Sequence, residues 1–279
     1  MAAQFPADKV TTMRLVRMKN RGEKIVCLTA YDFPFARIID EAGVDIVLIG
    51  DSAANVIYGM PTTLSIGMEE MLYHTRAVAN GVRRALIVSD MPFLSYQISI
   101  ERAIENAGRL LKAGAEAVKL EGAGPVVTTV RTLVEYGIPV MGHLGLTPQA
   151  VHKLGGYRLQ ARTPDEQNKL LQDALELEQA GCFALVLEKI PAELAKQVTM
   201  RLRIPTIGIG AGPDCDGQVL VLQDLLGFFE APKFKFVKRY AEIGRDVRRA
   251  VENFITDVRS GIFPGKEHSF YSDEGSQKS

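Results

Sequence analysis

Five ionisable side chains stand at the ends of short apolar runs, or directly after them, along this chain of 279 residues. Such runs have the composition of buried parallel strands, and in barrels of alternating strands and helices the carboxyl ends of the strands carry the reacting groups. One polar residue after one strand is weak evidence, because loops begin there. Five at successive strand ends predict a shared active site, formed by Asp51, Asp90, Glu121, His143 and Glu188.

A lysine and a glutamate share one face of the fourth predicted strand. Lys119 and Glu121 are two residues apart, so their side chains point the same way, and the alternate residues are apolar. The apolar face suits a covering layer of helices, which directs Lys119 and Glu121 toward the site. A buried ammonium needs a partner. A purely structural lysine–carboxylate pair is the alternative, but Asp51 and Asp90 favour a functional role.

Three of the carboxylates would form an anionic cluster of oxygen ligands. Asp51, Asp90 and Glu121 can crowd together in the ionised state only with a cation nearby, and otherwise some must hold protons. Hard oxygen ligands without a neighbouring cysteine or histidine cluster suit Mg²⁺, with Mn²⁺ as a substitute. The alternative is that one or two of them cap the following helices. The pattern favours a metal site.

The elements that must position these residues alternate along the chain. Helical patterns such as residues 101–112 and 165–180 separate the apolar runs, and glycines at 43, 114, 137 and 181 predict left-handed helix ends. Repeated strand–helix units indicate either a closed barrel or a doubly wound sheet, and the closed (β/α)8 barrel is favoured. The predicted strands are residues 24–29, 45–49, 85–89, 117–121, 138–141, 183–187 and 205–209.

The eighth unit is harder to assign. Residues 217–222 could be a strand, but too few residues separate them from Ile209 for a parallel crossover, which usually needs a dozen or more. Asp216 as a cap therefore predicts a short helix over residues 217–226, followed by a brief eighth strand at 228–230. Residues 234–260 predict a long closing helix.

The ends of the chain bound a single predicted domain. An amphipathic helix within residues 1–23 is expected to plug the lower end of the barrel or to meet a neighbouring subunit. The barrel domain, with this helix, covers residues 1–265, and residues 266–279 are a polar tail.

Composition narrows the class of protein. Lysine plus arginine and aspartate plus glutamate both number 33, so no basic excess points to nucleic acid or to an anionic membrane. No apolar run reaches the length of about 18 residues that a membrane helix needs. The amino-terminal residues lack the pattern of a secretory signal, and the three scattered cysteines predict a cytoplasmic protein without disulfides.

The order and spacing of eleven short motifs resemble those of the ketopantoate hydroxymethyltransferase family. The resemblance runs from about residue 10 to residue 269. The motifs are TAYD at 29–32, GDS at 50–52, YHT at 73–75, DMPF at 90–93, VKLEG at 118–122, GHLGLTPQ at 142–149, GGY at 155–157, LE at 187–188, IGIGAG at 207–212, DGQ at 216–218 and PGKEHS at 264–269.

The resemblance implies a reaction, a barrel type and an assembly. A hydroxymethyl group would pass from 5,10-methylenetetrahydrofolate to 3-methyl-2-oxobutanoate through a Mg²⁺-bound enolate. The product would be 2-dehydropantoate, used to make pantothenate and coenzyme A. The fold would be a phosphoenolpyruvate mutase-like TIM barrel, and the enzyme a large homo-oligomer, commonly a decamer.

The resemblance also gives roles to residues by motif match. Glu188 would be the proton acceptor. The other matched positions hold the metal or contact the oxo acid: Asp51, Asp90 and Glu121 for Mg²⁺, and Asp51, Ser52, Asp90 and Lys119 for the oxo acid.

Several residues keep two interpretations. His143 would relay a proton, orient a ligand or be structural, whereas His74 in a helical pattern is interpreted as structural. The glycine-rich residues 208–212 would either admit a phosphate or the folate, or form a tight turn. Two rival functions are a related barrel lyase that acts through the same kind of enolate, and a noncatalytic ligand-binding barrel.

Overall fold

Eight parallel strands close into a barrel in the computed structural model, which describes residues 8–229 and 234–271. Each strand pairs with its neighbours in chain order, and β8 closes the barrel against β1. The predicted closed barrel is confirmed, and the first seven strands lie within about four residues of their predicted limits. The strands are β1 Ile25–Thr29, β2 Ile46–Ile49, β3 Leu86–Asp90, β4 Ala117–Glu121, β5 Val140–Gly145, β6 Ala184–Glu188, β7 Thr206–Ile209 and β8 Gly217–Leu220.

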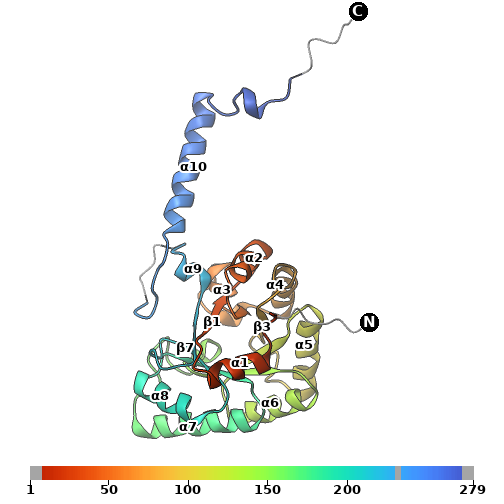
Figure 1. The fold of residues 1–279 in the computed structure, drawn as a ribbon, viewed down its shortest axis with the longest axis vertical. Helices are drawn as coiled ribbons and strands as arrows, with labels where there is room; N and C mark the ends of the chain where they lie inside the picture. The colour runs from red at the N-terminus through yellow and green to blue at the C-terminus, as the bar shows by residue number, and fades with distance from the viewer. Residues whose placement is uncertain (1–7, 230–233, 272–279) are drawn as a thin grey trace, which may run out of the picture. The chain divides into compact units, whose positions relative to one another are not determined.

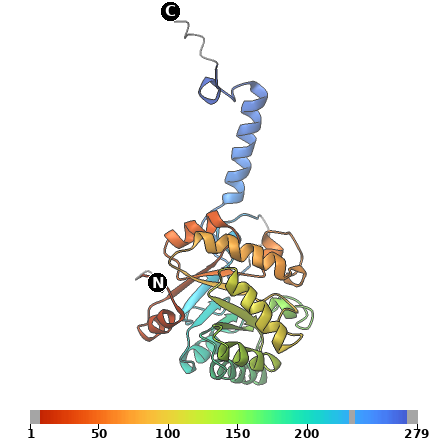
Figure 2. The ribbon, with the colours of Figure 1, turned by 90° about the vertical axis from the view of Figure 1, so that its right-hand side faces the viewer.

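The helices between residues 33 and 201 surround the strands (Figures 1 and 2). The four glycines predicted at helix ends, 43, 114, 137 and 181, all have positive φ. No helix in the described part of the chain is long and apolar enough to cross a membrane. The helices are α1 Thr12–Asn20, α2 Phe33–Glu41, α3 Ala53–Val56, α4 Met68–Gly81, α5 Ile100–Lys112, α6 Pro125–Glu135, α7 Pro164–Gln179, α8 Ala192–Arg201, α9 Leu222–Leu225 and α10 Ile243–Ser260, with 3-10 turns η1 Thr63–Ser65, η2 Pro148–Ala150 and η3 Lys266–His268.

Side-chain caps begin several of these helices. The Asp32 carboxylate accepts a hydrogen bond from the Phe35 amide at the start of α2, at 2.9 Å. Thr163 and Glu166 form a reciprocal capping box at the start of α7. Such caps satisfy amide groups that have no partner within the helix, and so they fix where the helix begins.

The interior of the barrel changes from apolar to polar along the strands. On β4, Ala117 belongs to the apolar core, and Lys119 and Glu121 follow on the same inward face. The carboxyl ends of the strands therefore carry charge above an apolar floor. The residues of that floor include Ile25, Cys27, Ile46, Leu48, Leu86, Val88, Ala117, Met141, Ala184, Val186, Ile207 and Val219.

Helix α1 and the segment before it pack against this floor. Val10 and Leu15 are fully buried in the same core cluster, and Met18 packs against it. The Val10 amide also donates to the Arg84 carbonyl, just before β3, at 2.8 Å. The predicted plug at the lower end of the barrel is confirmed.

The eighth unit differs from its prediction. The strand is Gly217–Leu220, so the expected helix over residues 217–226 is wrong, and α9 is one short turn. Phe228 and Phe229 are not in a strand, and Glu230 lies outside the described residues. Residues 210–216 connect the end of β7 to the start of β8. At about 3.3 Å each when extended, they are long enough to span the length of the four-residue β7 without a helix.

Two contacts explain why β8 begins at Gly217. A Cβ there would lie 2.4 Å from the Ile25 carbonyl oxygen, so only glycine lets the two strands approach. Asp216 does not cap a helix. Its carboxylate accepts from the Thr206 amide at 2.8 Å and from Lys19 Nζ at 2.7 Å, which joins the starts of β7 and β8 to α1.

Beyond Leu222 the chain forms a second compact unit, and the barrel unit takes in Phe234–Val237. The predicted closing helix over residues 234–260 begins nine positions later than expected, at Ile243. The amides of Tyr240 and Ile243 donate to the carbonyls of Leu225 and Leu226. These donors are therefore not available for a helical turn before Ile243.

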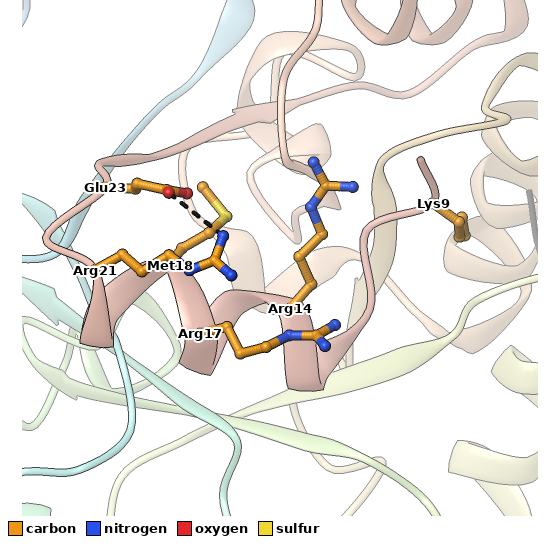
Figure 3. A pocket seen from close by; sticks show the side chains of 6 residues that line it. All are labelled: Lys9, Arg14, Arg17, Met18, Arg21 and Glu23. Atoms are coloured by element: carbon orange, nitrogen blue, oxygen red, sulfur yellow. Dashed lines mark ion pairs between the residues drawn. The ribbon is translucent and has the colours of Figure 1, made fainter. Parts of the chain in front are cut away.

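A cavity of about 240 Å³ lies beside α1 (Figure 3). Lys9 on its rim donates to the carbonyl of Ala85, which directly precedes β3, at 2.7 Å. The cavity is therefore at the amino-terminal end of the strands, opposite to the polar layer. Its lining residues are Lys9, Arg14, Arg17, Met18, Arg21 and Glu23.

Shortening Leu15 tests the contribution of α1 to the barrel. Leu15→Ala leaves a space in the fully buried floor, and we expect a loss of about 2–5 kcal/mol in the free energy of unfolding, measured in urea. Met13→Ala on the same helix is the control, because Met13 is 68% exposed, and its change should stay within about 0.5 kcal/mol. Equal effects of the two substitutions would contradict the plug.

Candidate active site

The register of the central strands brings the predicted charged residues together. Asp90 on β3 is paired with Lys119 on β4, and Glu121 on β4 is paired with His143 on β5. Lys119 Nζ lies 3.0 Å from Asp90 Oδ1 and 3.9 Å from Glu121 Oε1. All four residues are buried. A lysine ammonium at this depth is stable only because carboxylates surround it.

Asp51 and Ser52 enter the site from the loop after β2. The Asp51 amide donates to Asp90 Oδ2 at 2.9 Å, which joins the ends of β2 and β3. The Ser52 hydroxyl lies 2.8 Å from the Tyr31 hydroxyl. Asp51 is buried and Ser52 is partly exposed. Both therefore lie at the predicted end of the barrel, with Ser52 nearer to solvent.

His143 connects the cluster to Glu188. Its Nδ1 lies 3.3 Å from Glu121 Oε1, and its Nε2 lies 3.3 Å from Glu188 Oε2. The Glu188 side chain is 15% exposed, whereas those of His143 and Glu121 are 3% exposed. Glu188 thus contacts the buried cluster through His143 and is also accessible from solvent.

Burial and mutual contacts shift the acidities of the cluster. Although burial opposes it, the surrounding carboxylates raise the pKa of Lys119, which therefore stays an ammonium. Burial, together with Glu121 and Asp90, raises the pKa of Asp51 well above its usual range. Burial also raises the pKa of Asp90, against the effect of Lys119. Although burial acts against it, His143 and Lys119 lower the pKa of Glu121.

The carboxylates meet the requirements of a hard cation. Asp90 Oδ1 and Glu121 Oε1 are buried and accept no well-formed hydrogen bond, although Lys119 Nζ is 3.0 Å from the first. Burial raises the pKa of Asp51, and the neighbouring carboxylates of Glu121 and Asp90 raise it further, so a cation would stabilise its ionised form. Within the described residues, no three His, Cys, Asp or Glu side chains are grouped to hold a metal alone. Mg²⁺ is typically held by one or two carboxylates, with water and substrate oxygens, so the donor set fits.

Two further residues belong to this site that the sequence did not single out. The Gln149 amide donates to Asp51 Oδ2, and its backbone NH donates to Glu121 Oε2, both at 3.0 Å. Tyr96 donates to Gln149 Oε1 at 2.8 Å. Gln149 is the last residue of the GHLGLTPQ motif, and its place in that motif could have indicated a role in the site. Nothing in the sequence around Tyr96 indicated a contact 53 positions away.

The motif that contains His74 and the glycine-rich residues 208–212 have structural contacts. His74 is buried, with Nδ1 2.7 Å from the Tyr31 carbonyl oxygen and Nε2 3.0 Å from the Tyr58 hydroxyl, which agrees with its structural interpretation. In the glycine-rich residues 208–212, a Cβ on Gly212 would lie 2.5 Å from Ala192 Cβ. This close packing favours the tight turn.

The fold of this chain resembles that of solved (β/α)8 barrels. The crystal structure of phosphonopyruvate hydrolase matches with a TM-score of 0.61 and 13% identity, over 94% of this chain and 92% of that one. The structure of 2,3-dimethylmalate lyase, a PEP mutase/isocitrate lyase superfamily member, matches with a TM-score of 0.59 and 18% identity, over 95% and 93%. At these identities the matches show the fold alone, a PEP mutase-like (β/α)8 barrel.

Sequence comparison gives the particular family. The family model for ketopantoate hydroxymethyltransferase matches residues 9–266, and the chain belongs to this family. It is 55% identical to a 3-methyl-2-oxobutanoate hydroxymethyltransferase of Syntrophotalea carbinolica, over 93% of this chain and 98% of that protein. A relative of the same name from Caldicellulosiruptor bescii is 53% identical, over 94% and 100%.

The protonation of His143 gives a test of the site's electrostatics in metal-free protein. Burial and the Lys119 ammonium favour the neutral ring, but Glu121 and Glu188 outweigh them and raise the pKa of His143 to about 9. The ordinary value is about 6.5. The stabilising contribution of the imidazolium is therefore complete below about pH 6.5 and is lost as the pH rises through about 9.

We expect His143→Gln to destabilise the metal-free protein most at about pH 6, and progressively less toward pH 10. Urea unfolding across this range measures the difference. Ring-nitrogen NMR should show one imidazole, absent from the variant, that titrates near pH 9. His152→Gln, on the exposed side of the loop after β5, should leave that signal in place. A His143 signal that titrates near pH 6.5 would contradict the assignment.

Proposed function

We propose that this chain acts as a 3-methyl-2-oxobutanoate hydroxymethyltransferase, which makes ketopantoate for pantothenate biosynthesis. The observation that carries the proposal is the identity of 55% over 93% of the chain to a protein of that name. The buried cluster of Asp51, Asp90, Lys119 and Glu121 adds physical support, because Lys119 and a cation held by the carboxylates would provide positive charge for the anionic 2-oxo acid. The one-carbon donor implied by this activity is 5,10-methylenetetrahydrofolate.

We propose that Asp51, Asp90 and Glu121 hold Mg²⁺, some of them through water. The buried oxygens of Asp90 and Glu121 without hydrogen bonds support this assignment. When bound, the ion supplies Lewis-acid stabilisation to the oxygens of the 2-oxo acid.

The residues around the cation bind and orient the oxo acid. Lys119 holds a fixed positive charge where negative charge develops on the keto oxygen, and its burial makes that charge effective. Asp90, 3.0 Å from Lys119 Nζ, keeps the ammonium in place, and Asp51 and Asp90 would help to hold the cation. The partly exposed Ser52 hydroxyl, fixed by Tyr31 at 2.8 Å, is a donor at the outer side.

Glu188 is the proposed proton acceptor. Its carboxylate takes the proton from C3 of 3-methyl-2-oxobutanoate, and the electron pair of that C–H bond forms the enolate. C3 then bonds to the methylene carbon of the folate, and the two carbon–nitrogen bonds of that methylene break. Water supplies the hydroxyl group, and the two nitrogens take up the remaining proton of the water and the proton held by Glu188. His143 Nε2 lies 3.3 Å from Glu188 Oε2, so His143 orients the Glu188 carboxylate and can exchange a proton with it.

Glu188→Gln separates substrate binding from proton transfer. The variant keeps the shape of the side chain but cannot take the C3 proton, so we expect kcat to fall by about 10²–10⁴-fold. The affinity for 3-methyl-2-oxobutanoate should change little, because Lys119 and the metal residues are intact. Deuterium exchange at C3 in D₂O without folate, followed by NMR, isolates this step.

The controls for this exchange are matched in charge. Glu193→Gln removes an exposed carboxylate from the first turn of α8 and should exchange at the native rate. A chelator should suppress exchange in the native protein, and added Mg²⁺ should restore it. Exchange at the native rate in Glu188→Gln would remove Glu188 from the mechanism.

We also propose that the chain works as a homo-oligomer, with ten subunits as the family resemblance implies. Helix α10 supports an assembly, because it has no buried residue and exposes an apolar stripe. The stripe consists of Val247, Val251, Phe254, Ile255 and Val258.

Light scattering tests the assembly. At micromolar concentration the measured mass should correspond to more than two chains of 30.6 kDa each. Val251→Glu places a charge on the stripe and should lower the mass, whereas Arg249→Gln on the same helix should not. A native mass of one chain would overturn the proposal.

A cytoplasmic location is the remaining proposal. Cys27, Cys182 and Cys215 are free and buried. Burial raises the pKa of the Cys182 thiol to about 12, so the thiol stays protonated. Buried, protonated thiols of this kind are small core residues and suit a reducing compartment.

A further inference from the structure

Gln149 lies where three strand ends meet, although it belongs to none of them. It sits in the short turn η2, Pro148–Ala150, after β5, and it is 7% exposed. Its side-chain Nε2 donates to Asp51 Oδ2 at 3.0 Å and to the Met91 carbonyl at 2.9 Å. Its backbone NH donates to Glu121 Oε2 at 3.0 Å. One residue therefore contacts the ends of β2, β3 and β4.

The hydrogen bonds around the amide fix which way it points. Nε2 faces two groups that only accept, the Asp51 carboxylate and the Met91 carbonyl. Oε1 faces donors, with the Tyr96 hydroxyl at 2.8 Å and Gln97 Nε2 at 3.4 Å. A flipped amide would set its oxygen against both acceptors and lose these bonds. Tyr96, 3% exposed, thus locks the donor side of Gln149 onto Asp51.

These contacts divide the oxygens of the carboxylates into two sets. Gln149 occupies Asp51 Oδ2 and Glu121 Oε2, and the Asp51 amide occupies Asp90 Oδ2. The other oxygens of Asp90 and Glu121 are buried and accept no well-formed hydrogen bond. Asp90 Oδ1 is 3.0 Å from Lys119 Nζ, and Glu121 Oε1 is 3.3 Å from His143 Nδ1. Neutral amide donors thus hold one oxygen of each carboxylate, and the second oxygen of Asp90 and of Glu121 faces positively charged partners, which are Lys119, His143 and the proposed divalent cation.

We propose that Gln149 is a positioning residue, which orients the Asp51 and Glu121 carboxylates for a hard divalent cation and is itself oriented by Tyr96. The proposal rests on the proposed metal site. Residues that hold metal ligands by hydrogen bonds raise metal affinity because they fix the ligand before the ion arrives.

Direct cation binding tests this, with Mn²⁺ alone as the probe, because it accepts the same oxygen ligands and its free form is read by EPR. Gln149→Met keeps the length of the side chain and the backbone NH but removes the amide. We expect its Kd for Mn²⁺ to rise about 10–100-fold. Tyr96→Phe frees the Gln149 amide to flip and also removes the acceptor of the Glu121 backbone NH, which lies 3.2 Å from the Tyr96 hydroxyl, so it should weaken binding in the same direction. Gln172→Met, on the exposed face of α7, is the matched control and should bind as the native chain does.

The outcomes separate this inference from the metal site beneath it. A folded Gln149→Met with native Mn²⁺ affinity overturns the role of Gln149 and leaves the metal site standing. Native protein that binds no Mn²⁺ at millimolar concentration overturns the metal site, and the inference with it. A merely structural role would lower the melting temperature without changing Kd for the folded protein. If Gln149→Met does not fold, Tyr96→Phe decides, and native affinity in that variant counts against the inference.

Discussion

The buried ammonium of Lys119 is the interaction on which the rest of the site depends. It lies within the barrel, 3.0 Å from Asp90 and 3.9 Å from Glu121, and 4% of its side chain is exposed. An ion at this depth is stable only with opposite charge close by, and the carboxylates in turn need the ammonium. Burial raises the pKa of Asp51, and the neighbouring carboxylates of Glu121 and Asp90 raise it further, so the cluster favours a further cation.

The barrel makes this concentration of charge possible by separating it from the apolar floor. Alternation along β4 places Ala117, Lys119 and Glu121 on one face, so a single strand runs from core to site. Val10 and Leu15 are fully buried against the floor and extend the apolar core below the strands. The stability of the fold therefore resides mainly at one end of the strands and the chemistry at the other.

Hydrogen bonds between strand ends give the site its rigidity. His143 lies between Glu121 on β4 and Glu188, and so it connects Glu188, the proposed base, to the buried cluster. Gln149 reaches back across the barrel to Asp51, 98 positions earlier in the chain. These contacts orient carboxylates that would otherwise rotate, and a fixed orientation lowers the reorganisation needed when substrate binds.

The sequence by itself determined the repeating strands, their inward faces and the residues at their ends, because these follow from alternation and local composition. Asp51, Asp90, Lys119, Glu121 and Glu188 were all found in this way. The tertiary structure decided which of them touch, because the strand register sets Asp90 beside Lys119 and Glu121 beside His143. It also decided that β8 follows a short loop, since Gly217 allows contact with Ile25 that no local pattern shows. Gln149 and Tyr96 emerged only there, because their partners lie far away in the chain.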